Sequence, residues 1–196
     1  MEIVIHRINK IKELKNIPQK YGCEIDIRTN SSKLILNHDP FIGGESFIDY
    51  LDEYKHGLLI LNIKETGIEQ VVLKEVRKRK IVNFFLLDVE FPYLYRASRE
   101  GERAIAVRFS EDESIEMANN YKNKVDWVWI DTNTKLPLDS KIIAQLNGLK
   151  TCLVCPERWG RPNDIINYRK QMESYNFELD AVMTSMKCVK DWTRHI

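Results

Sequence analysis

The hydrophobic positions fall into short runs rich in β-branched and aromatic residues, which recur along the whole chain. Such runs, bounded by polar and turn-forming residues, are typical of β-strands. Most of them are apolar at nearly every position, as in strands buried on both faces of a parallel sheet. We expect strands within residues 2–8, 23–28, 33–38, 58–64, 82–89, 103–109, 125–131, 150–156 and 179–185.

Segments with helical periodicity lie between many of these runs. The clearest patterns cover residues 68–80, 114–123, 140–149 and 163–176. Strands that alternate with helices favour a parallel α/β sheet, and about eight such units are typical of a (β/α)8 TIM barrel. The alternative is an open, doubly wound sheet, but no strand is followed by the G-x-G-x-x-G turn of the dinucleotide-binding form. The sequence therefore predicts a compact TIM barrel, formed by a single domain over residues 1–196.

Composition and charge exclude several classes of protein. Of the 196 residues 43% are hydrophobic and 30% are charged, which is typical of a globular chain. The net charge of +1 gives no general reason to expect a nucleic acid or an anionic membrane as partner. The sequence contains no apolar run long enough for a membrane span, and MEIVIHRINK does not have the pattern of a secretory signal. We therefore expect a cytoplasmic protein with reduced cysteines.

Polar residues cluster where the predicted strands end, which is where parallel α/β barrels carry their chemistry. Glu24 and Asp26 are two residues apart on one strand, so their side chains project to the same face. Two carboxylates crowded on an interior face are costly unless a cation lies between them. The pair therefore predicts a hard divalent ion such as Mg²⁺ or Ca²⁺, to which Asn62 could add an amide oxygen.

Histidines and cations complete the predicted site. His6 and His38 end neighbouring strands, and a histidine pair can take up one proton and release another near neutral pH. Arg7 and Lys64 suit the oxygens of a phosphate group. Together with a metal, these groups favour attack on a phosphodiester over acyl or hydride transfer. Possible additional site residues at the ends of other strands are Asp88, Glu90, Asp131, Glu157 and Trp159.

The order of these motifs resembles a known family. His6-Arg7, then Glu24-x-Asp26, then His38-Asp39 is similar to the pattern of the glycerophosphodiester phosphodiesterases, a family of TIM-barrel enzymes related to phosphatidylinositol phospholipase C. The segment LDAVMTS at 179–185 resembles the last strand of that family.

The resemblance implies a role for each matching residue. His6 and His38 would be the general acid and base, Arg7 and Lys64 would contact the phosphate, and Glu24 and Asp26 would hold the divalent metal.

The sequence departs from the family at two motifs. The E-x-K motif of the family reads Asn62-Ile63-Lys64, so that an amide replaces a carboxylate ligand, and the P-E-N-T segment that usually follows the first motif is missing. We expect either hydrolysis of a glycerophosphodiester-like or nucleotide-linked substrate, or a barrel that binds a phosphorylated small molecule without turnover.

Overall fold

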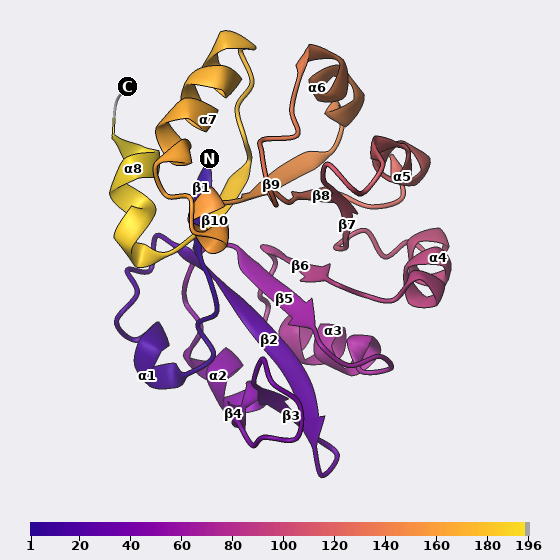
Figure 1. Cartoon of the computed structure of the whole chain (residues 1–196). Coiled ribbons are helices and arrows are strands. Elements are labelled where there is room, and N and C mark those ends of the chain that lie inside the picture. The colour runs from indigo at the N-terminus through magenta and orange to yellow at the C-terminus, as the bar shows by residue number, and fades with distance from the viewer. Residues whose placement is uncertain (195–196) are drawn as a thin grey trace. The chain divides into compact units, whose positions relative to one another are not determined.

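The computed structural model describes residues 1–194, and the chain divides into two compact units. The N-terminal unit comprises Val4–Ala97, and the C-terminal unit comprises Met1–Ile3 together with the chain from Ser98 onward. Figure 1 follows the chain through both units by colour. Within residues 1–194, none of the helices is long and apolar enough to cross a membrane. The prediction of one domain over 1–196 stays a prediction.

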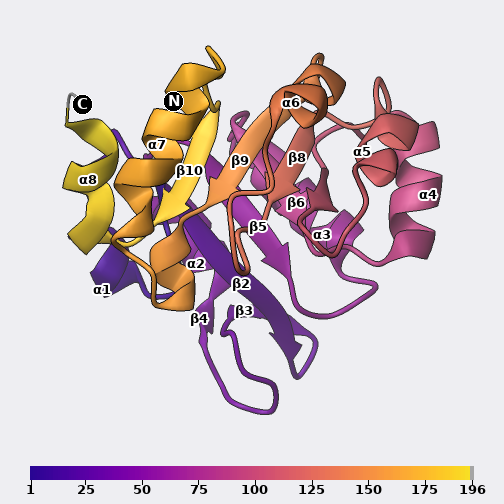
Figure 2. The ribbon, with the colours of Figure 1, turned by 45° about the horizontal axis from the view of Figure 1, so that its top comes forward.

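The longest strand, β2, is the centre of the sheet in the N-terminal unit. It pairs in parallel with β1 and β5 and in antiparallel fashion with β3, and the sheet continues from β5 to β6 and from β3 to β4. Figure 2 shows β3 beside the C-terminal half of β2, toward the head of its long arrow. The strands are β1 (Glu2–Ile5), β2 (Gly22–Asn30), β3 (Lys33–Leu36), β4 (Glu45–Ser46), β5 (Leu59–Ile63) and β6 (Phe84–Leu87).

Helices follow several of these strands, and local sequence explains where they begin and pack. The side chain of Ser46 caps α2 by accepting the backbone N–H of Asp49 at 3.3 Å. Helix α3 buries Val72, Leu73 and Val76, which share one face because they are three to four residues apart. The helices up to Arg99 are α1 (Ile11–Leu14), α2 (Phe47–Glu53), α3 (Glu69–Lys78) and α4 (Phe91–Arg99).

The C-terminal unit contains a parallel sheet in the order β7-β8-β9-β10. Residues 127–130 and 181–184 are buried at every position, as expected for parallel strands covered on both faces. Its elements are β7 (Ala106–Phe109), α5 (Ile115–Tyr121), β8 (Trp127–Ile130), α6 (Ser140–Leu146), β9 (Lys150–Val154), the 3-10 helix η1 (Pro156–Trp159), α7 (Asp164–Ser174), β10 (Ala181–Thr184), the 3-10 helix η2 (Met186–Cys188) and α8 (Val189–Thr193).

The structure confirms the strand and helix pattern that the sequence predicts. Each of the apolar runs contains a strand, each of the four helical patterns contains a helix, and the pairing of consecutive β-α units is parallel. Sequence analysis missed α1, α2, α4, α8 and β4, most of which are too short to show a full hydrophobic period. The architecture is therefore mixed α/β, and closure into an eight-stranded barrel stays a prediction.

Candidate active site

Two buried carboxylates on β2 form the centre of the site in the N-terminal unit. Glu24 and Asp26 are each only 1% exposed, and both lie within β2, where buried hydrophobic residues flank them. Their spacing of two residues places them on the same face, as the sequence predicts. Ionised carboxylates at this depth need partners, because burial without compensation is strongly unfavourable.

The segment after β1 supplies the first set of partners. The backbone N–H of Arg7 donates to Glu24 Oε2 at 2.8 Å, and His6 Nε2 lies 3.9 Å from the same oxygen. Arg7 Nε lies 3.6 Å from Asp26 Oδ2. Arg7 adopts the left-handed conformation with φ 57°, which costs a residue with a Cβ roughly 1 kcal/mol or more. This strained turn aims the backbone N–H and the guanidinium of one residue at two different carboxylates.

Strand β5 adds an amide and a cation. Asn62 is opposite Asp26 in the β2–β5 register, and its Nδ2 donates to Glu24 Oε1 at 2.9 Å. Its Oδ1 is buried and has no hydrogen-bond partner within the described protein. Lys64 Nζ lies 3.5 Å from Asp26 Oδ1 and 3.7 Å from Asp88 Oδ2. A buried, unpaired carbonyl oxygen is costly, so Asn62 Oδ1 marks a place for an electropositive ligand.

Asp88 is a second strained residue beside this cluster. It follows β6 and has a φ of 60°, in the same left-handed region as Arg7. Its carboxylate and that of Asp26 both lie within 3.7 Å of Lys64 Nζ, so the ammonium is held between two anions. Glu90, the neighbouring candidate, is exposed, and its backbone carbonyl accepts the Leu94 N–H at the start of α4.

His38 lies at the edge of a cleft with a volume of about 700 Å³. Its Nδ1 is 2.7 Å from Asp39 Oδ1, and this hydrogen bond lowers the pKa of the Asp39 carboxyl. An imidazole bonded through Nδ1 presents Nε2 as its reactive nitrogen. Arg7 and His38 line the same cleft together with Asn9. The cleft therefore joins a predicted acid-base residue to a predicted phosphate contact.

The charge balance at the centre of the site leaves Glu24 incompletely compensated. Burial, reinforced by the neighbouring charge of Asp26, raises the pKa of Glu24 from 4.5 to about 7. Hydrogen bonds from Asn62 and from the Arg7 backbone, and the charge of Lys64, act in the opposite direction but do not cancel this effect. Additional positive charge beside Glu24 would therefore stabilise its ionised form.

The donor set fits a hard divalent cation in its chemistry. Glu24 and Asp26 offer carboxylate oxygens, and the unpaired Oδ1 of Asn62 offers a neutral amide oxygen, which are the ligand types that Mg²⁺ and Ca²⁺ prefer. Within residues 1–194 there is no cluster of three or more His, Cys, Asp or Glu side chains arranged for a metal. Such an ion would therefore depend on Asn62 as a third ligand.

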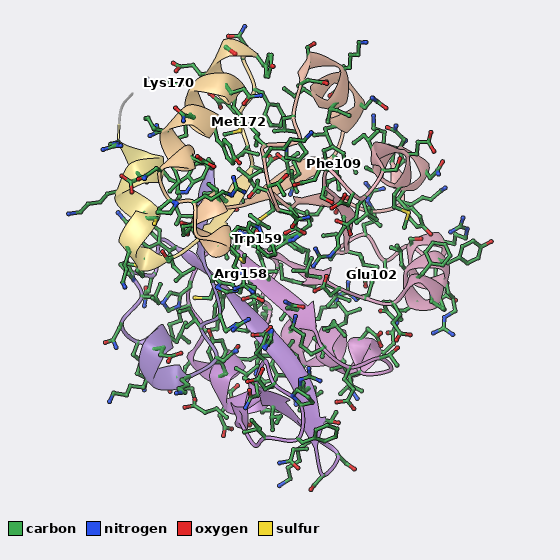
Figure 3. All side chains as sticks on the ribbon, viewed as in Figure 1. Glu102, Phe109, Arg158, Trp159, Lys170 and Met172 are labelled. Carbon is green, nitrogen blue, oxygen red and sulfur yellow. The ribbon has the colours of Figure 1, made fainter. Side chains whose placement is uncertain are left out.

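The three remaining candidates belong to the C-terminal unit, where Asp131 and Glu157 have local structural partners. Asp131 forms an ion pair with Arg108 on the neighbouring strand. Glu157 Oε1 accepts the Thr184 hydroxyl at 2.6 Å and the Ser185 N–H at 2.8 Å. Trp159, labelled beside Arg158 in Figure 3, is half-exposed on the short helix that follows β9. A functional role for these three residues stays a prediction.

Two residues that sequence analysis did not consider contribute to the site. Asn9 and Asp26 exchange two hydrogen bonds of 2.8 Å, one to the carboxylate and one from the backbone N–H of Asp26. Arg28 donates to the carbonyl oxygens of His38 and Lys64. The pattern Glu24-x-Asp26-x-Arg28 could have indicated Arg28, because these positions alternate on one face. Nothing in the sequence indicates Asn9.

Comparison with known proteins supports the fold but only at low sequence identity. Neither a family model nor a curated protein matches the chain. The solved structure of a glycerophosphodiester phosphodiesterase from Agrobacterium tumefaciens is 15% identical, with a TM-score of 0.66, and the match covers 93% of this chain and 95% of that one. The chain has the fold of the glycerophosphodiester phosphodiesterases.

A second solved structure gives the same result. A phosphodiesterase from Oleispira antarctica, in complex with the product sn-glycerol-3-phosphate, is 14% identical with a TM-score of 0.66, and the match covers 99% of this chain and 97% of that one. Both matches span nearly the whole chain, so the similarity of fold is not confined to a shared sheet. The resemblance that the sequence motifs indicate is confirmed at the level of the fold.

Proposed function

We propose that this chain hydrolyses a small phosphodiester, either glycerophosphodiester-like or nucleotide-linked, by general acid-base catalysis between His6 and His38. The observation that carries the proposal is the buried Glu24–Asp26 pair on β2, flanked by His6, Arg7 and Lys64. Such a cluster of compensated charges is expensive to fold and is typical of a catalytic centre. The fold similarity to phosphoric diester hydrolases supports the same reaction class.

The proposed mechanism assigns proton transfer to the histidines and charge stabilisation to the cations. One histidine takes a proton from the nucleophile, which is water or a neighbouring hydroxyl of the substrate, as the nucleophile oxygen bonds to phosphorus. The other histidine gives a proton to the leaving oxygen as the bond of that oxygen to phosphorus breaks. Arg7 and Lys64 bind the non-bridging oxygens, whose negative charge they stabilise in the transition state. Asp39 holds the His38 ring through Nδ1.

Glu24, Asp26 and Asn62 would hold a divalent cation, Mg²⁺ or Ca²⁺. The bound ion would polarise the phosphoryl group as a Lewis acid. The unpaired Oδ1 of Asn62 and the incomplete compensation of Glu24 support this assignment. Because the third ligand is neutral, we expect binding weaker than at a site of three carboxylates.

The test is hydrolysis of a panel of phosphodiesters, read by phosphorus NMR. The panel spans glycerophosphodiesters, lysophospholipids, nucleotide diphosphate conjugates and a chromogenic diester, each with Mg²⁺, Ca²⁺ or chelator. We expect release of a phosphomonoester or cyclic phosphate that falls by 100-fold or more in His6→Ala and His38→Ala. His56→Ala is the matched control, because His56 lies in the same unit and bonds to the backbone carbonyl of Ile17.

One observation favours a second candidate, a protein that binds a phosphorylated small molecule without turnover. Asn62 Nδ2 donates a hydrogen bond to Glu24 Oε1, so a neutral amide N–H occupies a carboxylate oxygen that a cation could otherwise bind. A wild-type chain that binds a phosphomonoester but leaves the entire panel intact would support this candidate and refute the hydrolase proposal.

A further inference from the structure

Arg28 connects two segments of the proposed active site through three hydrogen bonds. Its Nε and Nη2 donate to the carbonyl oxygen of His38 at 3.1 and 3.0 Å, and its Nη1 donates to the carbonyl oxygen of Lys64 at 2.9 Å. His38 follows β3 and Lys64 follows β5, and both of these strands pair with β2. One side chain on β2 therefore holds the backbone on both sides of it.

The chemistry of these contacts requires a guanidinium. Arginine offers five N–H donors in a rigid planar fork, so that two carbonyl groups in different directions can be satisfied at once. A lysine ammonium could reach one of these carbonyls but has no fixed geometry that holds two apart. Arg28 is partly buried, so its removal would leave the carbonyl oxygens of His38 and Lys64 without these hydrogen bonds.

The two carbonyl groups belong to His38, the proposed acid or base, and to Lys64, a proposed phosphate contact. The His38 ring is oriented by Asp39, but the position of that dyad depends on the backbone of residue 38. The Lys64 ammonium lies between Asp26 and Asp88, and its place also depends on the backbone from which it extends. Displacing a reacting group by about 1 Å can reduce turnover on the order of 100-fold.

We infer that Arg28 is a positioning residue that fixes His38 and Lys64 relative to each other. The inference rests on the proposed function, because it assumes that His38 and Lys64 act on a phosphodiester. Within residues 1–194, Arg28 donates its side-chain hydrogen bonds to these two carbonyl oxygens and not to Glu24 or Asp26. Its effect passes through the two backbone segments.

The experiment compares Arg28→Met and Arg28→Lys with a matched control, Arg79→Met. Arg79 also makes several hydrogen bonds within the N-terminal unit, to Asp52 and Glu75, but none of these partners belongs to the site. Three kinds of measurement are made on each variant: steady-state kinetics (kcat and KM for the phosphodiester turned over best), the ¹⁵N and ¹H resonances of the His38 imidazole, and Tm. The His38 signals are assigned by their loss in His38→Ala.

We expect Arg28→Met to lower kcat on the order of 100-fold with a smaller change in KM, and to shift or broaden the His38 imidazole signals. Arg28→Lys should give an intermediate kcat, since it keeps the charge and one hydrogen bond. Arg79→Met should lower Tm and leave both kcat and the His38 signals unchanged.

Two results would overturn the inference. One is an unaltered His38 signal in Arg28→Met. The other is a change in kcat and in the His38 signals of Arg79→Met equal to that in Arg28→Met, which would mean that both arginines only stabilise the fold. If the wild type hydrolyses no phosphodiester, the proposed function fails, but the His38 signals of the folded variants still decide whether Arg28 positions that residue. Arg28→Lys serves this purpose should Arg28→Met not fold.

Discussion

The sheets of the two units both carry buried acidic residues, but these are compensated in different ways. In the C-terminal unit, Asp131 pairs one to one with Arg108 across adjacent strands. In the N-terminal unit, two adjacent carboxylates on one strand share Arg7 and Lys64, and Glu24 keeps a pKa of about 7. A one-to-one ion pair such as Asp131–Arg108 is compatible with a purely structural role. Two crowded carboxylates beside the unpaired Asn62 Oδ1 destabilise the folded state, and such destabilising clusters are typical of functional sites.

Among residues 1–194, positive φ angles occur just after helices in both units, including Lys80 after α3, but only in the N-terminal unit do charged residues adopt them just after strands. In the C-terminal unit, Asn123, Gly148 and Asn176 have positive φ at or just after helix ends, where the left-handed conformation ends a helix. In the N-terminal unit, Arg7 and Asp88 adopt it directly after parallel strands, beside the carboxylate cluster. Strain at a helix end is part of ordinary chain reversal, whereas strain in charged residues at a strand end indicates a functional requirement.

The sharpest test of this contrast removes one cation from each unit. Lys64→Met should reduce turnover roughly 100- to 1000-fold, because a charge that stabilises the transition state is lost and Asp26 loses a partner. Arg108→Met removes the partner of Asp131 and should leave turnover within about twofold of wild type, since its role is structural. Steady-state kinetics on both variants measures the difference, and equal losses would contradict the comparison.

The pH dependence of stability tests whether Glu24 is under-compensated. The pKa of Glu24 is raised to about 7 from an unfolded value near 4.5, so the folded state holds its proton more tightly. The stabilisation linked to that proton is complete below the unfolded pKa and is lost as pH rises toward 7. With chelator present, wild type should lose up to roughly 3 kcal/mol relative to Glu24→Gln between about pH 4.5 and 7.

Urea unfolding of both proteins at several pH values gives this difference directly. A difference between wild type and Glu24→Gln that stays constant across the range would mean that Arg7 and Lys64 already compensate Glu24 fully. In that case the buried acidic residues of the two units would be alike in their charge balance.

Introducing a carboxylate at position 62 should strengthen the proposed metal site. Asn62→Glu places a third anion beside Glu24 and Asp26, so we expect affinity for Mg²⁺ or Ca²⁺ to rise about tenfold or more. The same variant should be less stable than wild type in chelator, because repulsion among the carboxylates is then uncompensated. Thermal unfolding at graded ion concentrations measures both effects, with Asn62→Gln as the neutral control.

The smallest effect is expected at the ion pair of the C-terminal unit. Asp131→Asn should cost about 1 kcal/mol of stability, because Arg108 is partly exposed and water replaces the lost partner. In the double variant Arg108→Met/Asp131→Asn, the loss in free energy of unfolding should be no larger than the sum of the losses in the two single variants. A large fall in turnover on Asp131→Asn would instead make Asp131 a site residue, as the sequence analysis allows.

The sequence by itself determined most of the strands and the shared face of the two central carboxylates. Apolar runs located the strands because burial on both faces leaves few polar positions, and the two-residue spacing of Glu24 and Asp26 fixed their shared face. The motifs at His6, Glu24 and His38 indicated the fold that the solved structures support at 14–15% identity. Short helices such as α1 and α8 escaped detection because four or five residues carry too little periodicity.

Only the tertiary structure decided which polar residues act on one another. Local sequence gives no sign that Asn9 bonds to Asp26 or that Arg28 holds the carbonyls of His38 and Lys64. It also does not distinguish Asp131, which is paired with Arg108, from Asp88, which shares a lysine with Asp26. These contacts join segments distant in sequence, and their energies depend on burial and geometry that exist only after the strands pair.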